Sequence, residues 1–371
     1  MEDNRVASSK ILPKTSSRAS NIELLRIITI LGVIILHYNN ESIGGGYKYV
    51  LPDSLNYYVL DFLESVFICA VDLFILISGY FMINTQKRSI IKPLKLIIQV
   101  VVFKLAFFIL LLILGKSDFS IKRLVGNILP DNYFVILYCA VFFVSPYINL
   151  VMKALDKKQL KRMTLTIFLI FSVYAIVVDV LSDFRGDNLN GLSSVGLYGS
   201  QSGYTIVNFI MMYIIGAYIR LNDEKMSNYK NRKLIPIFFA LVIVDMIWFN
   251  ALKLLNIKSQ TAHSYLNPIV VMMAVVAFLI FKNIDIGSKS VINNLAKGSF
   301  TVFLAHSYMI TSIKIESFVN ENILILLAHI VISVVGIYLI CWVLFFVYEK
   351  VTMPIYTLIE KKIGKTEYTV E

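Results

Sequence analysis

The chain has 371 residues, of which 57% are hydrophobic and only 16% are charged. Soluble domains average about 45–50% apolar and about 25% charged residues, so this composition excludes an ordinary soluble fold. The formal net charge of +11 would suit a nucleic-acid partner, but the basic residues lie between apolar runs and form no stripe with interleaved aromatics. We therefore expect an all-α, polytopic transmembrane helical bundle in a lipid bilayer, with no nucleic-acid partner.

Ten apolar runs follow one another along the chain, each near the roughly 20 residues that a helix needs to cross a bilayer. The predicted spans are 22–38, 58–83, 93–115, 132–152, 163–181, 204–221, 234–255, 265–281, 299–313 and 322–349. They define a cytoplasmic polar tail over 1–20, a transmembrane domain over 21–350 and a cytoplasmic tail over 351–371.

The density of basic residues alternates between successive loops. With the N-terminus inside, 25 of the 35 Lys and Arg residues fall in cytoplasmic segments and eight fall outside. Cytoplasmic loops of membrane proteins carry such an excess of Lys and Arg. The predicted topology therefore has about ten spans and both termini in the cytoplasm.

The first predicted span carries Glu23, Arg26 and His37. Glu23 and Arg26 are three residues apart, so they can pair on one helical face. Arg26 and His37 are eleven residues apart, which returns them to the same face about 16 Å along the helix. Histidine is well suited to general-base work near neutral pH. Alternatively, Arg26 extends to the inner interface and His37 marks the outer end of the span.

The second predicted span holds Asp61, Glu64 and Asp72. Ionisable groups within spans are costly, so they usually face the bundle interior or a wet cavity. Glu64 or Asp72 is placed to orient His37 if the first two helices pack together, although Asp61 and Glu64 also suit outer interfacial water. Asp245, in the seventh span, is open between a functional role and structural hydrogen bonding.

The other chemical signals are sparse. His306 lies within the ninth span, where a satisfied core histidine is the default interpretation, and His263 and His329 show no evident partner. The three cysteines, Cys69, Cys139 and Cys341, lie inside apolar runs without metal-like or disulfide-like spacing. No nucleotide-binding P-loop, metal-spaced cluster or nucleophile elbow is present in the sequence, which disfavours an ATP-driven pump, a metal site and a conventional hydrolase.

A basic cluster, QKRSIIKPLK, follows the second span and contains Arg88, Lys92 and Lys95. Positive charge on the inner side is sufficient to explain it. A phosphate-bearing cytosolic donor would use the same residues, helped by the start of the third helix.

Several stretches, taken in order, resemble the integral-membrane acyltransferase 3 family, whose members O-acylate bacterial surface glycans. They cover roughly residues 21–312 and are NIELLRIITILGVIILHYNN, AVDLFILISGYFM, QKRSIIKPLK, DNYFVILYCAVFFVSPYINLVMKAL, IVNFIMMYIIGAYIR, SYLNPIVVMMAVVAFLIFK and KGSFTVFLAHSYMI. The family's basic residue followed by a histidine eleven positions later matches Arg26 and His37. Its paired basic motif after the second helix matches the spacing of Lys92 and Lys95, and Tyr133 stands where a Trp is common.

The resemblance implies a multi-pass O-acyltransferase, and more specifically an acetyltransferase, of a bacterial cell membrane. Acetyl-CoA or another acyl-CoA would be the donor, with phosphates on Arg88, Lys92 and Lys95. The acceptor would be a surface polysaccharide or a lipid-linked glycan. His37 would act as the base or carry the acyl group.

Supporting roles follow from the same reasoning. Arg26 would position the first helix or contact the donor, and Asp72 and Glu64 would orient His37. We expect Arg26, His37, Asp72 and His306 to face one interior cavity. The rival hypothesis is a carrier or exporter of a surface polysaccharide or lipid-linked glycan, in which the buried carboxylates and histidines line a translocation path.

Overall fold

The protein was analysed as a computed structural model that describes residues 19–85, 87–186, 189, 201–257, 261–363 and 367–368. Over this part of the chain the all-α expectation is confirmed, apart from one two-residue strand pair. The first half consists of α1 Ser20–Asn39, α2 Gly46–Tyr49, α3 Leu55–Phe67, α4 Ala70–Met82, β1 Arg88–Ser89, α5 Ile91–Ile113, α6 Ile121–Ile128, α7 Tyr133–Ala154, α8 Lys157–Phe168, the π-helix η1 Leu169–Tyr174 and α9 Ala175–Arg185.

The second half continues the helical pattern. It consists of η2 Gln201–Gly203, α10 Ile206–Leu221, α11 Asp223–Met226, α12 Asn231–Leu254, α13 Pro268–Lys282, α14 Ser290–Lys297, α15 Ser299–Ile310, η3 Ile315–Ser317, α16 Ile323–Ile363 and β2 Glu367–Tyr368. The strands β1 and β2 pair antiparallel, with Arg88 opposite Tyr368.

Every predicted apolar run lies on helix, but the lengths differ from the prediction. Among the described residues, six segments are long and apolar enough to cross a membrane: 20–39, 91–113, 121–154, 157–185, 231–254 and 323–361. The apolar helices α10, α13 and α15 are shorter. The second predicted span, 58–83, is two helices of 13 residues each, α3 and α4, because the helix is interrupted at Ile68 and Cys69.

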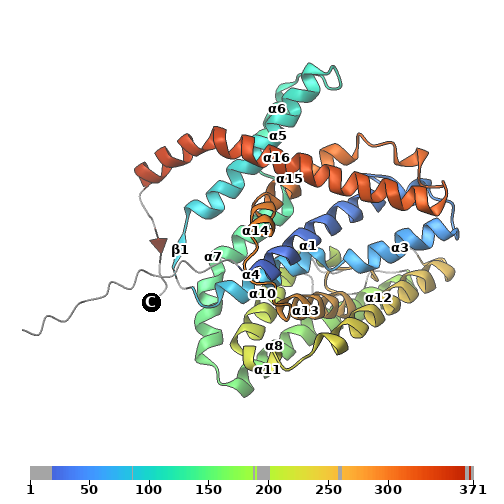
Figure 1. The fold of residues 1–371 in the computed structure, drawn as a ribbon. Coiled ribbons are helices and arrows are strands. Elements are labelled where there is room, and N and C mark those ends of the chain that lie inside the picture. Colours follow the sequence, from blue (N-terminus) through green and yellow to red (C-terminus); the bar gives the residue numbers. More distant parts are fainter. Residues whose placement is uncertain are drawn as a thin grey trace, which may run out of the picture.

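Helix α1 lies in the interior of the bundle and packs against α3, α4, α13, α14, α15 and α16 (Figure 1). Its side chains Ile30 and Ile34 are fully buried. Because neighbouring helices surround α1, its polar residues face other helices rather than lipid.

Helices α4 and α10 pack closely against each other. A Cβ atom added to Gly79 would lie 2.1 Å from the backbone oxygen of Tyr213, and one added to Gly216 would lie 2.1 Å from that of Leu76. Small residues on facing helices let the two backbones approach, as is common in membrane bundles. This contact fixes α4, and therefore Asp72, in the interior.

The last helix, α16, has 41 residues and is about 60 Å long at 1.5 Å per residue, roughly twice the hydrocarbon thickness of a bilayer. It extends beyond the rest of the bundle towards the β1–β2 pair (Figure 1). The predicted tail over 351–371 is thus helical as far as Ile363.

Candidate active site

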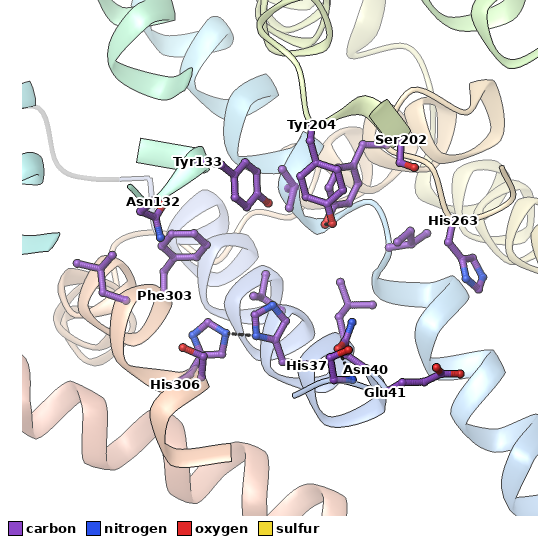
Figure 2. A pocket seen from close by; sticks show the side chains of 18 of the residues that line it. His37, Asn40, Glu41, Asn132, Tyr133, Ser202, Tyr204, His263, Phe303 and His306 are labelled. Atoms are coloured by element: carbon purple, nitrogen blue, oxygen red, sulfur yellow. Dashed lines mark hydrogen bonds between the residues drawn. The ribbon is translucent and has the colours of Figure 1, made fainter. Parts of the chain in front are cut away.

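A cavity of about 810 Å³ lies where several helices begin or end. Its walls come from the C-terminal ends of α1 and α15, the start of α7, and the segments that precede α10 and α13 (Figure 2). Its volume falls in the range of about 300–1,000 Å³ that is typical of small-molecule sites. Segments far apart in the sequence therefore converge on one chamber large enough for a substrate.

Two histidines face each other in this cavity. Nε2 of His306 lies 3.0 Å from Nδ1 of His37, and the two ring centroids are 4.6 Å apart (Figure 2). His306 is 1% exposed, whereas His37 is partly open to the cavity. The other ring nitrogen of His306, Nδ1, lies 2.8 Å from the backbone oxygen of Val302.

These two contacts determine where the protons sit when both rings are neutral. A carbonyl oxygen only accepts hydrogen bonds, so Nδ1 of His306 must carry a hydrogen and donate it to Val302. Nε2 of His306 then has a lone pair and accepts from Nδ1–H of His37. The remaining nitrogen of His37, Nε2, keeps its lone pair, and no described residue donates a hydrogen bond to it.

The turn after α1 holds His37 at the cavity wall. The backbone N–H of Gly44 donates to the carbonyl oxygen of His37 at 3.0 Å. A Cβ atom at Gly44 would lie 2.6 Å from that oxygen, and Gly45 has a φ of +85°. Glycine is therefore required for the chain to fold back over the helix end.

The neighbouring residue Tyr38 anchors the same end of α1 to α16. Its hydroxyl lies 2.8 Å from Nδ1 of His329, and His329 stacks on Phe318 with a centroid distance of 4.1 Å. The expectation that His329 lacks a partner is therefore wrong. The sequence conceals the contact because Tyr38 and His329 are 291 residues apart.

Three tyrosines form an aromatic row along another wall. The ring centroids of Tyr133 and Tyr204 are 4.9 Å apart (Figure 2). The ring centroids of Tyr204 and Tyr265 are also 4.9 Å apart. The side chain of Asn132 accepts from the N–H of Val135, so it caps α7 and places Tyr133 at the start of that helix. Tyr133 therefore lies in the cavity at the position where the family resemblance implied Trp.

Arg26 lies elsewhere. Its Nη1 is 2.9 Å from Oε1 of Glu23, which is the ion pair that their spacing predicted. Arg26 and Asp72 are not among the described residues that line the cavity, whereas His37 and His306 are. The expectation that all four share one cavity is thus correct only for the two histidines, because eleven residues of helix separate Arg26 from His37.

The two carboxylates predicted to orient His37 have other partners. Glu64 lines the cavity, and its Oε2 accepts from Nδ2 of Asn39 at 2.9 Å. Asp72 is 1% exposed and accepts from Nδ2 of Asn208 at 3.1 Å. No hydrogen bond in the described structure joins either carboxylate to His37. The neighbour that contacts His37 is His306, whose role the sequence left open.

The basic cluster is dispersed. Arg88 is 2% exposed, and its guanidinium donates to Oγ of Ser145 at 3.0 Å and to the carbonyl oxygens of Met82, Thr85 and Lys87. Lys95 pairs with Glu360 at 2.9 Å. Lys92 is exposed, and the described residues supply it with no ion pair. None of the three is among the described residues that line the cavity.

The fold and site define a multi-pass membrane protein with paired histidines in a substrate-sized cavity. The model of the acyltransferase domain of the acyltransferase 3 family matches residues 20–346, most of the chain. The protein belongs to this family and is a membrane acyltransferase, with an acyl donor, an acceptor and a lipid bilayer as its partners. No curated protein and no solved structure matches the chain.

Proposed function

We propose that this protein is an O-acyltransferase of a bacterial cell membrane, which moves an acetyl group from cytosolic acetyl-CoA to a hydroxyl of a surface glycan or its precursor. The observation that carries the proposal is the histidine pair, in which Nδ1 of His37 faces His306 at 3.0 Å within the cavity. This pairing leaves Nε2 of His37 with a lone pair on a ring that is open to the cavity.

The chemistry follows from that lone pair. Nε2 of His37 takes the proton of the acceptor hydroxyl as the hydroxyl oxygen attacks the thioester carbonyl carbon. The C–O ester bond forms, the C–S bond breaks, and the thiolate leaves with the proton that His37 returns. His306 is a positioning residue: it holds His37 in the tautomer that presents Nε2, because its own Nδ1–H is committed to Val302.

A covalent route uses the same atom. Nε2 of His37 attacks the thioester first, carries the acyl group, and passes it to the acceptor hydroxyl. Both routes require Nδ1 of His37 to be the protonated nitrogen, so the hydrogen bond to His306 supports either one equally.

In the predicted topology, the cavity opens to the outside and the basic cluster lies inside, so we assign the acceptor to the cavity and the donor phosphates to the basic cluster. With about ten spans and both termini in the cytoplasm, α1 ends on the outside, so the cavity receives the acceptor from there. The N-terminal end of α5 then lies inside, where Lys92 is exposed and Lys95 is nearby. We assign the donor phosphates to Lys92 and Lys95, and we assign to Arg88 the task of ordering the segment before them through its bonds to residues 82–87.

The remaining candidates take supporting roles. Arg26, held by Glu23, lies between the inner side and His37 on the same helix, which suits contact with the donor. Val33, Val71 and Val100 form an apolar part of the cavity lining. We assign the pantetheine arm of the donor to this part. Asp72 joins α4 to α10 through Asn208.

The test is acyl transfer from labelled acetyl-CoA to surface glycan, in membranes with matched amounts of wild type and His37→Ala. Proton transfer by a positioned side chain contributes about 10²–10⁴-fold, so His37→Ala should lose activity on that scale. The control is Lys116→Ala, which removes an exposed side chain that does not line the cavity; it should retain transfer once protein amounts are equal.

The carrier hypothesis predicts a different result. If the wild type transfers no label, and glycan accumulates inside cells that lack the protein, then the proposed activity is wrong. If His37→Ala transfers label as well as the wild type, the proposed acyltransferase activity stands but His37 is not its catalytic residue.

A further inference from the structure

A second polar group of residues lies across the cavity from the histidine pair. Tyr47, Glu64 and His263 line the cavity, and Figure 2 shows His263 well away from His37 and His306. Two fully buried carboxylates, Asp61 and Asp245, lie behind them, and Oδ2 of Asp245 is 3.4 Å from Nε2 of His263. We call these five residues the acidic wall.

The acidic wall contains polar atoms that no protein group satisfies. Both carboxylate oxygens of Asp245, Oδ1 of Asp61 and the hydroxyl of Tyr47 lack a hydrogen-bond partner. The 3.4 Å separation from His263 is an ion-pair distance without hydrogen-bond geometry. Buried polar groups nearly always have partners, and leaving one unpaired costs about 1–3 kcal/mol.

The uncharged side chain of Asn39 also faces the acidic wall. Asn39 is fully buried, and its Nδ2 donates to Oε2 of Glu64, which directs the amide towards the acidic wall. Its Oδ1 has no partner. The unpaired atoms are thus mainly acceptors, so the missing partner is a group rich in hydrogen-bond donors.

The charges of the acidic wall do not balance. Three carboxyl groups act on one imidazole: burial lowers the pKa of His263, but its contact with Asp245, together with the charges of Glu64 and Asp61, raises it above its usual value overall. Burial and then the charges of Glu64 and Asp61 raise the pKa of the Tyr47 hydroxyl well above its usual range. The acidic wall therefore sets three carboxyl groups against a single imidazole.

The charge of Lys253 acts on Asp61, but the ammonium group of this lysine has other partners. Lys253 pairs with Asp53 at 3.0 Å and lies 3.9 Å from the centroid of the Tyr57 ring. A metal ion is not the expected counter-charge either, since no three His, Cys, Asp or Glu side chains among the described residues converge closely enough to hold one. A polyatomic cation with several N–H donors fits these conditions.

Aromatic rings complete the environment. Phe249 lines the cavity and stacks on His263 with a centroid distance of 4.4 Å, and its ring is 6.3 Å from that of Tyr47. Aromatic faces attract cations by about 0.5–1 kcal/mol at exposed sites and more where water is excluded. The wall therefore combines carboxylates and ring faces, which is the chemistry that recognises an ammonium group.

We propose that the acidic wall binds a primary ammonium group on the acceptor glycan, as on a sugar with a free amine. This inference rests on the proposed function, because it assigns the acceptor's side of the same cavity. The amine bound at Glu64, with Asp61 and Asp245 behind it, directs a hydroxyl elsewhere on the glycan towards Nε2 of His37. A carboxylate or phosphate in the same place faces carboxyl oxygens that can only accept hydrogen bonds when ionised, so anionic acceptors are disfavoured.

The experiment compares three monosaccharides with the purified full-length protein in lipid nanodiscs. Saturation-transfer NMR measures the affinities of D-glucosamine, N-acetyl-D-glucosamine and D-glucuronate. Glucosamine should bind at least about tenfold more tightly than the other two, as expected for charge-assisted hydrogen bonds. Glu64→Gln and Asp245→Asn should each reduce that preference severalfold while leaving the affinity for N-acetylglucosamine unchanged.

Two control variants isolate the effect. Asp118→Asn removes an exposed carboxylate far along the chain from the acidic wall, and its glucosamine preference should equal that of the wild type. His37→Ala should lose acyl transfer but keep the preference. Thermal melting of each variant checks that the fold is intact.

The outcomes separate the two proposals. Equal affinities for glucosamine and N-acetylglucosamine in the wild type, or a preference that survives both Glu64→Gln and Asp245→Asn, would overturn the ammonium site while leaving acyl transfer standing. A preference without any transfer by the wild type would keep the ammonium site and reject the proposed enzyme activity.

Discussion

The cavity and the basic cluster are both rich in polar residues, but their side chains are satisfied in different ways. In the basic cluster, the Arg88 guanidinium is buried and donates to one hydroxyl and three carbonyl oxygens, and Lys95 has Glu360. In the cavity, the Tyr47 hydroxyl lacks a hydrogen-bond partner and Nε2 of His37 receives no hydrogen bond from a described residue, and the Asp245 carboxylate behind the cavity wall has no hydrogen-bond partner either. Groups left unpaired at a cavity point to a ligand, whereas a charge that the fold already satisfies points to structure.

We expect the largest loss of activity at His306, and a variant at this position tests whether the cavity is the functional region. Replacing His306 with Leu removes the acceptor for Nδ1–H of His37, so His37 is free to adopt the unproductive tautomer. We expect kcat to fall about 10²-fold, at the lower end of what a positioned base contributes, with the KM for acetyl-CoA, the proposed donor, unchanged. Steady-state transfer kinetics measure both parameters.

The conservative variant His306→Asn provides the control. Its side-chain oxygen can still accept from Nδ1–H of His37, so it should recover a substantial part of the activity that His306→Leu loses. Equal loss in both variants, or a fall in folded protein that accounts for the change, would assign His306 a packing role only.

The second effect tests whether Arg88 is structural. Arg88→Ala removes four hydrogen bonds donated by a buried charged group, so the free energy of unfolding should fall by about 2–3 kcal/mol. Thermal or denaturant melting in detergent measures it. A stable variant with a raised KM for acetyl-CoA would return Arg88 to the donor site.

A smaller effect is expected at Lys92. Because this side chain is exposed and unpaired in the described structure, Lys92→Ala should leave stability unchanged and raise the KM for acetyl-CoA a few-fold, more at low salt than at high salt. An unchanged KM at low ionic strength would show that the inner lysine does not contact the donor.

The smallest effect is at Glu360, the partner of Lys95. Both side chains are about half exposed, and exposed ion pairs contribute little to stability. Glu360→Gln should therefore leave the melting temperature unchanged, while the freed Lys95 should lower the KM for acetyl-CoA slightly. A rise in that KM would indicate that Lys95 must be paired to work.

Local sequence features predicted much of the architecture. Apolar runs located the helices, because a helix needs about 20 mainly apolar residues to cross the hydrocarbon core of a bilayer. The interruption at Ile68 and Cys69 was not predicted, since both halves are apolar and the break depends on how α3 and α4 pack. The Glu23–Arg26 pair was predicted correctly because residues three apart share a helical face.

The sequence by itself determined the helical membrane class, the family and the position of His37 near the end of α1, since these depend on composition and on spacing within one helix. Only the tertiary structure decided that His37 contacts His306, 269 residues away. It also decided that the Arg88 guanidinium is buried and hydrogen-bonded to neighbouring residues. It also brought Glu64, Asp245 and His263 together from three segments. The physical reason is that the spacing of residues fixes directions along a helix, whereas contacts between helices depend on side-chain packing over the whole bundle.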